Sequence, residues 1–327
     1  MIRAWLLCAI SLLGGCLGPS PKLIPEVPNT PFVLVLGTAQ DGGLPQVACV
    51  CERCARARRD PGFQRLVASL LIVDPRNGAR WLVDATPDFP QQVQRAQAVA
   101  PRPPALGRPA LFDGIFLTHA HFGHYTGLAY LGREVYGAKD NAVWGSARMG
   151  AYLASNGPWS QLVETGNVNL HLLVPGESVR LSADLSITPF SVPHRDEFTD
   201  TLGFLVRGPN KSLVYIPDID KWSVFGAGAG GHGSAIEALI QSSDVALLDG
   251  SFFADGEIPG RAMQEIPHPF IRESLLRFAE LPREQRSKVH FTHLNHTNPA
   301  VDPAGTASAE VRAAGMRIAA EGQVFGL

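Results

Sequence analysis

The chain has 327 residues, of which 45% are hydrophobic and 18% are charged, and its formal net charge is −2. This apolar content is enough for a buried core and excludes wholesale disorder, and the length allows one large domain or two small ones. Because 28 basic and 30 acidic residues nearly balance, the chain has no electrostatic basis for coating nucleic acid, and we expect no nucleic-acid partner.

The N-terminus has the pattern of a secretory signal. A positive start at residues 1–3 precedes an apolar run at 4–13, which is too short for the ~20 residues that span a bilayer. The run ends in Leu-Gly-Gly-Cys16, which resembles the lipobox of bacterial lipoproteins. An ordinary signal peptide and a buried first helix are the alternatives.

By that resemblance, residues 1–15 are a lipoprotein signal peptide and Cys16 is the lipidated first residue of the mature chain. Residues 16–31 contain five prolines and predict a semi-extended tether that holds a domain off the membrane. Leu17 favours sorting to the outer membrane, so the expected location is the bacterial cell envelope, facing the periplasm.

From residue 32 to 327, strands and helices alternate without a detectable internal repeat, and we expect a single α/β domain. Apolar runs of three to seven residues bounded by turn residues predict the strands, and longer patterns with capping residues predict the helices. Strands are expected at 32–36, 69–73, 81–83, 114–117, 142–144, 185–191, 201–206, 212–216, 245–248 and 289–291, and helices at 86–98, 147–154, 235–241, 270–280 and 306–315.

Three of the five cysteines, Cys49, Cys51 and Cys54, form a C-x-C-x-x-C pattern. An odd trio is a poor disulfide framework in an oxidising compartment, whereas three thiolates at this spacing can converge on one tetrahedral zinc ion. Such a site leaves one position for a distant ligand. The alternative is a set of reactive or disulfide-linked thiols.

Histidines and one aspartate follow several of the expected strands. In Thr118-His-Ala-His-Phe-Gly-His124, an extended backbone would project His119 and His121 to the same side, which suits paired ligation of one ion. Surface histidines in a loop are the alternative. Further candidate ligands also follow expected strands: His194, Asp218, His293 and His296.

This order of H-x-H-x-x-H, His, Asp and His resembles the metallo-β-lactamase superfamily from Phe32 onward, and the resemblance implies an αββα sandwich. Residues 37–46, followed by Cys49, Cys51 and Cys54, resemble one branch more closely, and the segments 194–197, 217–220 and 292–299 resemble the quinone-biosynthesis side of that branch. That branch contains the pyrroloquinoline quinone biosynthesis B protein (PqqB) and the phosphonate-pathway cyclic phosphodiesterase.

The resemblance also implies roles for individual residues, with Asp218, His119 and His121 as the catalytic set. His171, His232, His268 and His290 are expected to be bystanders, and Asp249 either supports the site or caps a helix. The implied metal ligands are His119, His121 and His194 for a first ion, Asp218 as a bridge, His124 and His293 for a second ion, and His296 as the fourth ligand of the Cys49, Cys51 and Cys54 zinc.

One position departs from the superfamily pattern H-x-H-x-D-H, because Gly123 stands where the aspartate belongs. Three outcomes follow: one metal ion, two ions with another carboxylate or water filling in, or a binding protein without turnover. Asp41 and Asp220 are the candidates to compensate. We expect the second position to be weak or empty, and we expect Gly123→Asp to raise its occupancy.

The resulting expectation is a metal-dependent hydrolase that acts on a small ester or phosphodiester-type substrate through a metal-bound hydroxide. One or two divalent ions (zinc, manganese or iron) would serve the histidine site, beside the structural zinc. A PqqB-like oxidative role on a peptide-derived tyrosine, with iron, is the first alternative. A non-catalytic metal-bound binding or sensor module, favoured by Gly123, is the second.

Overall fold

The structure, a computed structural model, describes residues 26–103, 107–226 and 235–327. The expected signal peptide, Cys16, the first part of the tether and His232 lie outside the described residues, so the expectations for them stay predictions. Within the described part of the chain, no helix combines the length and the apolar character needed to cross a membrane.

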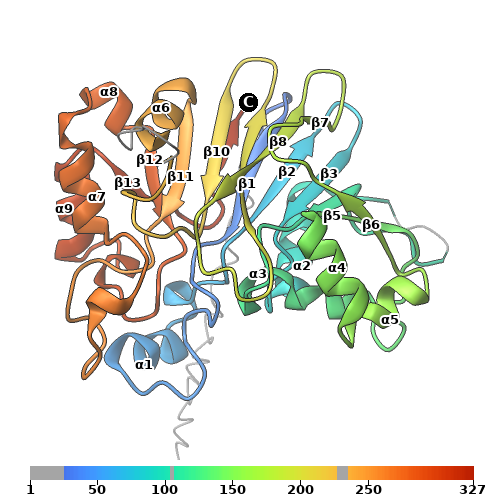
Figure 1. The fold of residues 1–327 in the computed structure, drawn as a ribbon, viewed down its shortest axis with the longest axis horizontal. Coiled ribbons are helices and arrows are strands. Elements are labelled where there is room, and N and C mark those ends of the chain that lie inside the picture. The colour runs from blue at the N-terminus through green and yellow to red at the C-terminus, as the bar shows by residue number, and fades with distance from the viewer. Residues whose placement is uncertain (1–25, 104–106, 227–234) are drawn as a thin grey trace, which may run out of the picture.

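Two seven-stranded sheets pack face to face (Figure 1). In the first sheet, the pairs β14–β1, β1–β2 and β2–β3 are antiparallel, and the pairs from β3 to β6 are parallel. In spatial order this sheet consists of β14 (Val324–Gly326), β1 (Phe32–Gly37), β2 (Ser69–Asp74), β3 (Ala79–Val83), β4 (Gly114–Phe116), β5 (Asn141–Gly145) and β6 (Val168–Leu172).

The second sheet repeats this arrangement, with antiparallel pairs from β7 to β10 and parallel pairs from β10 to β13. Its spatial order is β13 (Arg317–Ile318), β12 (Val289–Thr292), β11 (Val245–Asp249), β10 (Ser212–Ile216), β9 (Thr201–Arg207), β8 (Ser186–Val192) and β7 (Val179–Arg180).

Helices cover the outer faces of both sheets (Figure 1). The first sheet carries α2 (Phe89–Val99), α3 (Phe122–Tyr125), α4 (Ala147–Ser155) and α5 (Trp159–Glu164). The second sheet carries α6 (Ala235–Ser242), α7 (Ile271–Arg277), α8 (Arg283–Arg286) and α9 (Thr306–Ala313), while α1 (Glu52–Arg59) follows the cysteine pattern. Short 3-10 turns lie at Pro61–Phe63, Thr126–Leu131, Met263–Glu265, Phe278–Glu280 and Pro299–Val301.

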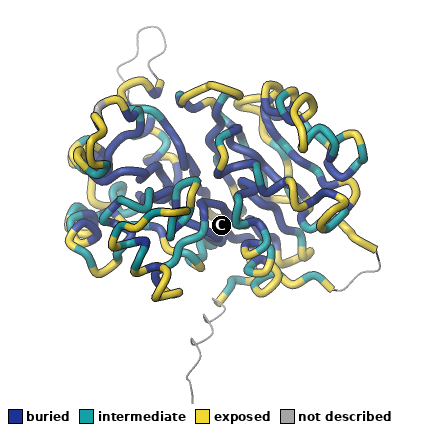
Figure 2. Tube along the Cα trace, turned by 90° about the horizontal axis from the view of Figure 1, so that it is seen from below, coloured by how far each residue is buried: buried dark blue, intermediate teal, exposed yellow. Residues whose placement is uncertain are grey.

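The core has three apolar layers, and β1 shows how the sequence builds two of them. Val33 and Val35 belong to the cluster between the sheets, whereas Phe32, Leu34 and Leu36 belong to the cluster under the first sheet's helices. Successive side chains of a strand point to opposite faces, so a strand buried on both faces reads as a continuous apolar run. Figure 2 accordingly shows buried residues along the strands in the interior of the molecule. These layers confirm the expected αββα sandwich.

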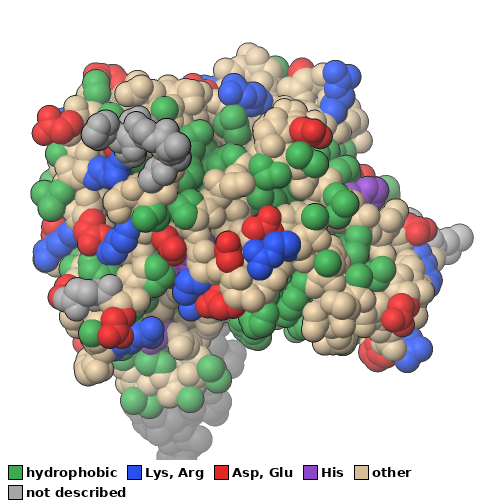
Figure 3. Space-filling model, viewed as in Figure 1, with side chains coloured by type: hydrophobic (Ala, Val, Ile, Leu, Met, Phe, Trp, Pro, Cys, Tyr) green, Lys and Arg blue, Asp and Glu red, His purple; other side chains and the backbone are tan. Residues whose placement is uncertain are grey.

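The elements that the sequence did not predict are short or lie at sheet edges, such as β6 and α1. Only Val168 of the five β6 residues is buried, and α1 contains mainly charged residues, so neither shows an apolar run. Acidic and basic side chains are intermixed on the face in Figure 3, in keeping with the nearly neutral chain.

Candidate metal centre

The loop after β4 brings two histidine rings together at the edge where the strands end. Nε2 of His119 lies 2.8 Å from Nδ1 of His121, and the His119 ring is buried. An imidazole nitrogen that carries no proton has a lone pair for a metal ion. Two such nitrogens at this distance can therefore ligate one ion.

His194 and Asp218 complete this first group from the second sheet, at the ends of β8 and β10. Asp218 Oδ2 lies 3.4 Å from His119 Nε2, and Asp218 Oδ1 lies 3.8 Å from His194 Nε2. One ligand atom from each of His119, His121, His194 and Asp218 falls within 4.8 Å of the others. We call these four residues the first group.

A second group consists of Asp41, His124 and His293, whose ligand atoms also lie within 4.8 Å of one another. Asp218 adjoins it, because its Oδ2 lies 3.1 Å from His124 Nε2 and 3.4 Å from His293 Nε2. The same carboxylate oxygen therefore faces both groups. Together the two groups form the histidine–aspartate centre.

Asp41 occupies the space that an aspartate at position 123 would need. The Gly123 N–H donates to Asp41 Oδ1 at 3.0 Å, and the same oxygen lies 3.6 Å from His124 Nε2. A Cβ atom on Gly123 would lie 2.2 Å from that oxygen and 2.8 Å from the Asp41 Cα. The structure therefore places Asp41, one of the two candidates to compensate, in the second group, and an aspartate at position 123 would collide with it. Asp220 lies beside His194 instead.

Several ligand atoms of the centre are buried without a hydrogen bond. Among the described residues, His194 Nε2, His293 Nε2 and Asp218 Oδ1 have no hydrogen-bond partner. A buried polar atom left unpaired costs free energy, so such atoms are rare unless an ion or water completes them. Imidazole nitrogens around a carboxylate are donors for zinc, manganese or iron, so the residues present fit a divalent cation.

Further side chains hold the ligand rings by their outer nitrogens. Asp84 Oδ2 lies 2.8 Å from His124 Nδ1, and Ser251 Oγ lies 3.0 Å from His293 Nδ1. Such partners fix the ring orientation and the tautomer. Asp84 was missed by the sequence analysis, although it follows β3 directly, as the ligand residues follow their strands.

Two carboxylates nearer the protein surface hold histidine rings of the first group in the same way. Glu197 Oε2 lies 2.9 Å from His121 Nε2, and Asp220 Oδ1 lies 3.2 Å from His194 Nδ1. Each leaves the other ring nitrogen toward the centre. Asp220 is therefore placed to orient His194 rather than to replace the aspartate missing at Gly123.

The backbone is strained at two positions of the centre. Asp84 and His293 have φ values of 65° and 59°, in the left-handed region that residues other than glycine rarely adopt. Such strain persists where surrounding contacts hold it, and it concentrates at functional sites. Asp84 also accepts the Thr118 N–H at 2.9 Å, which ties its loop to the segment before His119.

His268, expected to be a bystander, belongs to the centre. Its Nδ1 lies 2.8 Å from Asp249 Oδ2 and 3.3 Å from Asp218 Oδ1. Burial by itself would lower the pKa of His268, but the Asp249 and Asp218 carboxylates raise that pKa to about 9. Asp249 thus supports the site through His268. Of the other expected bystanders, His171 stacks on Trp144, 4.5 Å away between ring centroids, and His290 lies against Phe325.

The charge state of the centre suits cation binding. Burial, reinforced by neighbouring histidines, lowers the pKa of His119 well below its ordinary value, and burial also lowers the pKa of His293. Burial would raise the pKa of the Asp218 carboxyl, but His293 and His194 beside it lower that pKa well below its usual range. Neutral imidazoles around an ionised carboxylate are the protonation states that ligation requires. His124 differs: burial would lower its pKa, but the Asp84 and Asp218 carboxylates raise that pKa well above its ordinary value, so ligation by His124 requires the loss of a proton.

The cysteine pattern forms a separate group with His296. Cys49, Cys51, Cys54 and His296 each offer a ligand atom within 4.8 Å of the others, and the three thiols are free. His296 Nδ1 is buried without a hydrogen-bond partner in the described chain. Burial, followed by the neighbouring Cys49 and Cys51, raises the pKa of Cys54 to about 12. We call these four residues the cysteine group.

Comparison with known proteins gives both a family and relatives. Residues 79–293 match the family model described as the beta-lactamase superfamily domain. The chain is 29% identical over 323 residues to coenzyme PQQ synthesis protein B of Nitrosococcus oceani, an alignment that covers 89% of this chain and 98% of that relative.

Two solved structures share the fold. The zinc-bound PqqB from Methylobacterium extorquens superposes with a TM-score of 0.74 at 23% identity, covering 90% of this chain and 100% of that chain. A diphosphatase from the PhnP family superposes with a TM-score of 0.61 at 20% identity, covering 91% of this chain and 97% of that one. Both confirm the sandwich architecture.

Proposed function

The chain belongs to the metallo-β-lactamase superfamily and is PqqB-like, and from this membership we propose that it is a metal-dependent hydrolase of small ester or phosphodiester-type substrates. The observation that carries this proposal is the position of Asp218 Oδ2. That oxygen lies 3.4 Å from His119, 3.1 Å from His124 and 3.4 Å from His293. A carboxylate placed in this way can be shared by two ions.

In this proposal the first group holds one divalent ion, and the second group, which shares Asp218, holds another. Divalent ions supply acidity to a bound water molecule and polarise an acyl or phosphoryl oxygen. The protein's own residues supply orientation. Asp84 and Ser251 fix the His124 and His293 rings by their outer nitrogens.

His268 has a positioning role beside the shared carboxylate. Its Nδ1–H donates to Asp249, and the same nitrogen lies 3.3 Å from Asp218 Oδ1. Asp249 also accepts the Ile219 N–H at 3.1 Å, which ties this pair to the residue after Asp218. The Nδ1–H of His268 therefore faces Asp249, and the ring lies beside the Asp218 carboxylate and limits its rotation.

The proposal is tested with bis(p-nitrophenyl) phosphate and p-nitrophenyl acetate as substrates. The purified chain is chelated, reconstituted separately with zinc, manganese or iron(II), and compared with Asp218→Asn, which keeps the side-chain shape but removes its charge. We expect metal-dependent turnover that the variant lacks. Turnover of neither substrate above the Asp218→Asn level by any reconstituted protein would contradict the proposal and favour a binding or sensor module.

The relatives named coenzyme PQQ synthesis protein B favour a second candidate, an oxidative reaction on a peptide-derived tyrosine with iron in the histidine–aspartate centre. Oxygen consumption separates the two functions. If this second candidate is correct, the iron(II)-loaded chain consumes oxygen with a tyrosine-containing peptide, whereas the zinc-loaded chain does not. If hydrolysis is the function, both metal forms turn over the ester substrates.

We also propose that the cysteine group holds one structural zinc ion. Its four ligand atoms lie within 4.8 Å of one another, and they join the start of α1 to the segment after β12. The ligands belong to two segments far apart in the chain. A bound zinc would therefore contribute folding free energy directly.

The lipobox resemblance supports the proposal that the protein is a lipoprotein anchored through Cys16 and facing the periplasm, where it meets a small-molecule substrate. Cys16→Ser should move the protein from the membrane fraction to the soluble periplasmic fraction. Cys8→Ser, within the same apolar segment, is the matched control and should leave the protein membrane-bound. Unchanged partitioning of the Cys16→Ser variant would contradict lipidation.

A further inference from the structure

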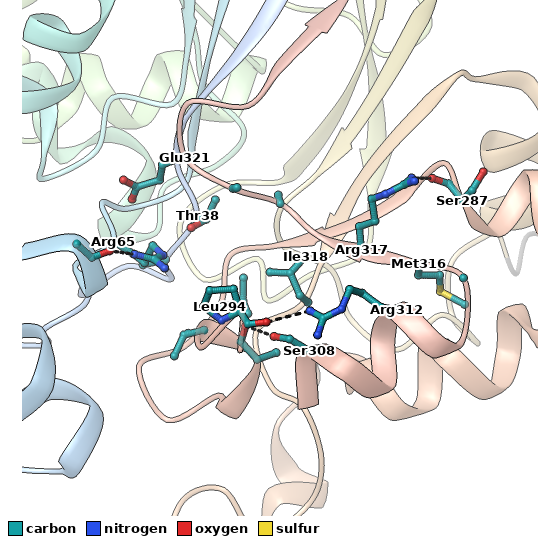
Figure 4. Close-up of a pocket in the computed structure, with 18 of the residues that line it drawn as sticks. Thr38, Arg65, Ser287, Leu294, Ser308, Arg312, Met316, Arg317, Ile318 and Glu321 are labelled. Atoms are coloured by element: carbon teal, nitrogen blue, oxygen red, sulfur yellow. Dashed lines mark hydrogen bonds between the residues drawn. The ribbon is translucent and has the colours of Figure 1, made fainter. Parts of the chain in front are cut away.

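A cavity of about 680 Å³ lies between the C-terminal segment and the loop after α1 (Figure 4). Thr38, Ala39 and Leu294 form part of its wall, next to the backbone that carries His293. Among the described residues, its lining includes no member of the histidine–aspartate centre or of the cysteine group. The cavity is therefore a separate site, and its size falls in the range of small-molecule pockets, roughly 300–1,000 Å³.

The charge in this cavity is one-sided. Four of its lining residues are arginines, Arg65, Arg283, Arg312 and Arg317, and Glu321 is the one acidic residue that lines it in the described chain. The Glu321 charge is compensated elsewhere, because Oε2 pairs with Arg95 at 2.7 Å. A chain whose net charge is only −2 thus places a concentrated positive charge around one concavity.

These arginines are not neutralised within the described chain, where none of the four forms a salt bridge with a carboxylate. Arg65 donates to the carbonyl oxygens of Gly62 and Gln64, Arg312 to that of Pro303, and Arg317 to that of Ser287. A guanidinium has five N–H donors, so each keeps donors available for a ligand. In Figure 4, Arg65 approaches from the segment after Pro61–Phe63, whereas Arg312 and Arg317 come from α9 and β13.

The rest of the lining is largely apolar. Leu294 and Ile318 lie between the arginines of the two sides (Figure 4), and the remaining apolar lining includes Ala300, Val301 and Met316. A bare inorganic anion would leave these side chains facing water. An apolar body with one anionic group would cover them and place its charge at the arginines.

We propose that this cavity binds a small organic anion, which has an apolar or aromatic body and one phosphate, sulfonate or carboxylate group. The anionic group pairs with Arg312, and the body lies on Leu294 and Ile318, toward Arg65 on the other side of the cavity. Arginine forms bidentate hydrogen bonds with such groups, so all three anions share the same recognition chemistry. The proposal is independent of the reaction at the histidine–aspartate centre.

The test uses two matched fluorescent probes on the full folded chain. 1-Anilinonaphthalene-8-sulfonate has an aromatic body and a negative charge, and N-phenyl-1-naphthylamine has the same body without the charge. We expect saturable binding of one sulfonate probe per chain, weakened by added salt, and much weaker binding of the neutral probe. Arg312→Gln should weaken sulfonate binding about tenfold, whereas Arg133→Gln, outside the cavity, should leave it unchanged.

Ala320 provides a pair of variants that separates charge from structure. It is exposed and lines the cavity, and it forms hydrogen bonds only through its backbone: its N–H donates to Gln323 Oε1, and its carbonyl oxygen accepts the Gln323 N–H. Ala320→Glu should weaken sulfonate binding several-fold, and Ala320→Lys should keep or strengthen it. Equal sulfonate affinity in the two variants, equal affinity of wild type for both probes, or no saturable binding at all would overturn the proposal.

Discussion

The histidine–aspartate centre and the cysteine group are built from the chain in different ways. The centre takes its candidate ligands from the loops after β1, β4, β8, β10 and β12. The cysteine group takes three of its four ligands from residues 49–54. The first is therefore a product of the folded sheets, whereas the second is largely a product of local sequence.

The two groups also differ in burial and in support. His124 and His293 are fully buried, whereas Cys49 and Cys51 are only half-buried. Asp84 and Ser251 hold the rings of the centre, whereas the Gln46 N–H donates to Cys54 Sγ at 3.3 Å in the cysteine group. In the proposed function, the histidine–aspartate centre serves the reaction and the cysteine group joins two segments of the chain. Loss of a ligand should therefore lower activity when it occurs in the histidine–aspartate centre and lower stability when it occurs in the cysteine group.

The largest effect is expected for His119→Ala, which removes a buried ligand of the first group. Hydrolysis of bis(p-nitrophenyl) phosphate should fall about 1,000-fold or more, because the ion at this position supplies several kcal/mol of stabilisation to the transition state. Elemental analysis should show a lost ion while the cysteine-bound zinc remains. His171→Ala, the same change in a ring that stacks on Trp144, is the control and should keep full activity and metal content.

Cys51→Ser should instead act on stability. Without the structural zinc, the melting temperature should fall by about 10 °C or more, while the activity per folded molecule remains close to wild type. Differential scanning calorimetry and metal analysis check this expectation. His296→Ala should produce the same loss, because all four ligands hold one ion. Wild-type melting with unchanged zinc in either variant would remove the distinction between the two groups.

Gly123→Asp should be the next most damaging change. The new Cβ would lie 2.2 Å from Asp41 Oδ1, so the second group must be displaced. We expect about 10–100-fold lower activity and one ion fewer per chain. The double variant Asp41→Gly/Gly123→Asp should recover part of both, since it removes the Asp41 side chain and moves the carboxylate to the position that the superfamily pattern uses, but keeps the Cα at position 41, which would lie 2.8 Å from the new Cβ. A double variant no better than either single change would show that the two positions are not equivalent.

Glu197→Gln should have the smallest effect. Glu197 orients His121 from outside, and its side chain is 47% exposed, so water can replace much of its contribution. Metal affinity at the first group should weaken about tenfold or less, measured by competition with a fluorescent chelator. Asp84→Asn, a buried partner of His124, should cost more. The reverse order would indicate that burial does not set the strength of this support.

The apolar runs predicted the central strands, because these strands are buried on both faces, and the resemblance to the superfamily implied the sandwich. Candidate ligands were also predicted directly after such strands, His119, His121 and Asp218 among them. The edge strand β6 shows no such run, because only Val168 among its five residues is buried. Strand edges of this kind carry little sequence signal.

Asp41 and His268 show why the sequence did not predict which contacts the other residues of the site make. Asp41 lies 82 residues before Gly123 in the chain, within a Gln-Asp-Gly-Gly segment that is also typical of an ordinary turn. His268 lies in a loop, not directly after a strand, and from there its Nδ1 lies 2.8 Å from Asp249 Oδ2 and 3.3 Å from Asp218 Oδ1. Both contacts depend on tertiary packing, which a local pattern does not encode.

The most direct test of the account is the number of metal ions per chain in wild type and in Asp41→Asn. Both proteins are purified in parallel, loaded with zinc, dialysed and analysed by inductively coupled plasma mass spectrometry. Since Asp41 supplies the carboxylate that Gly123 lacks, we predict three ions in wild type and two in Asp41→Asn. Two ions in wild type, with the same number in Asp41→Asn, would contradict the claim that Asp41 completes a second metal position.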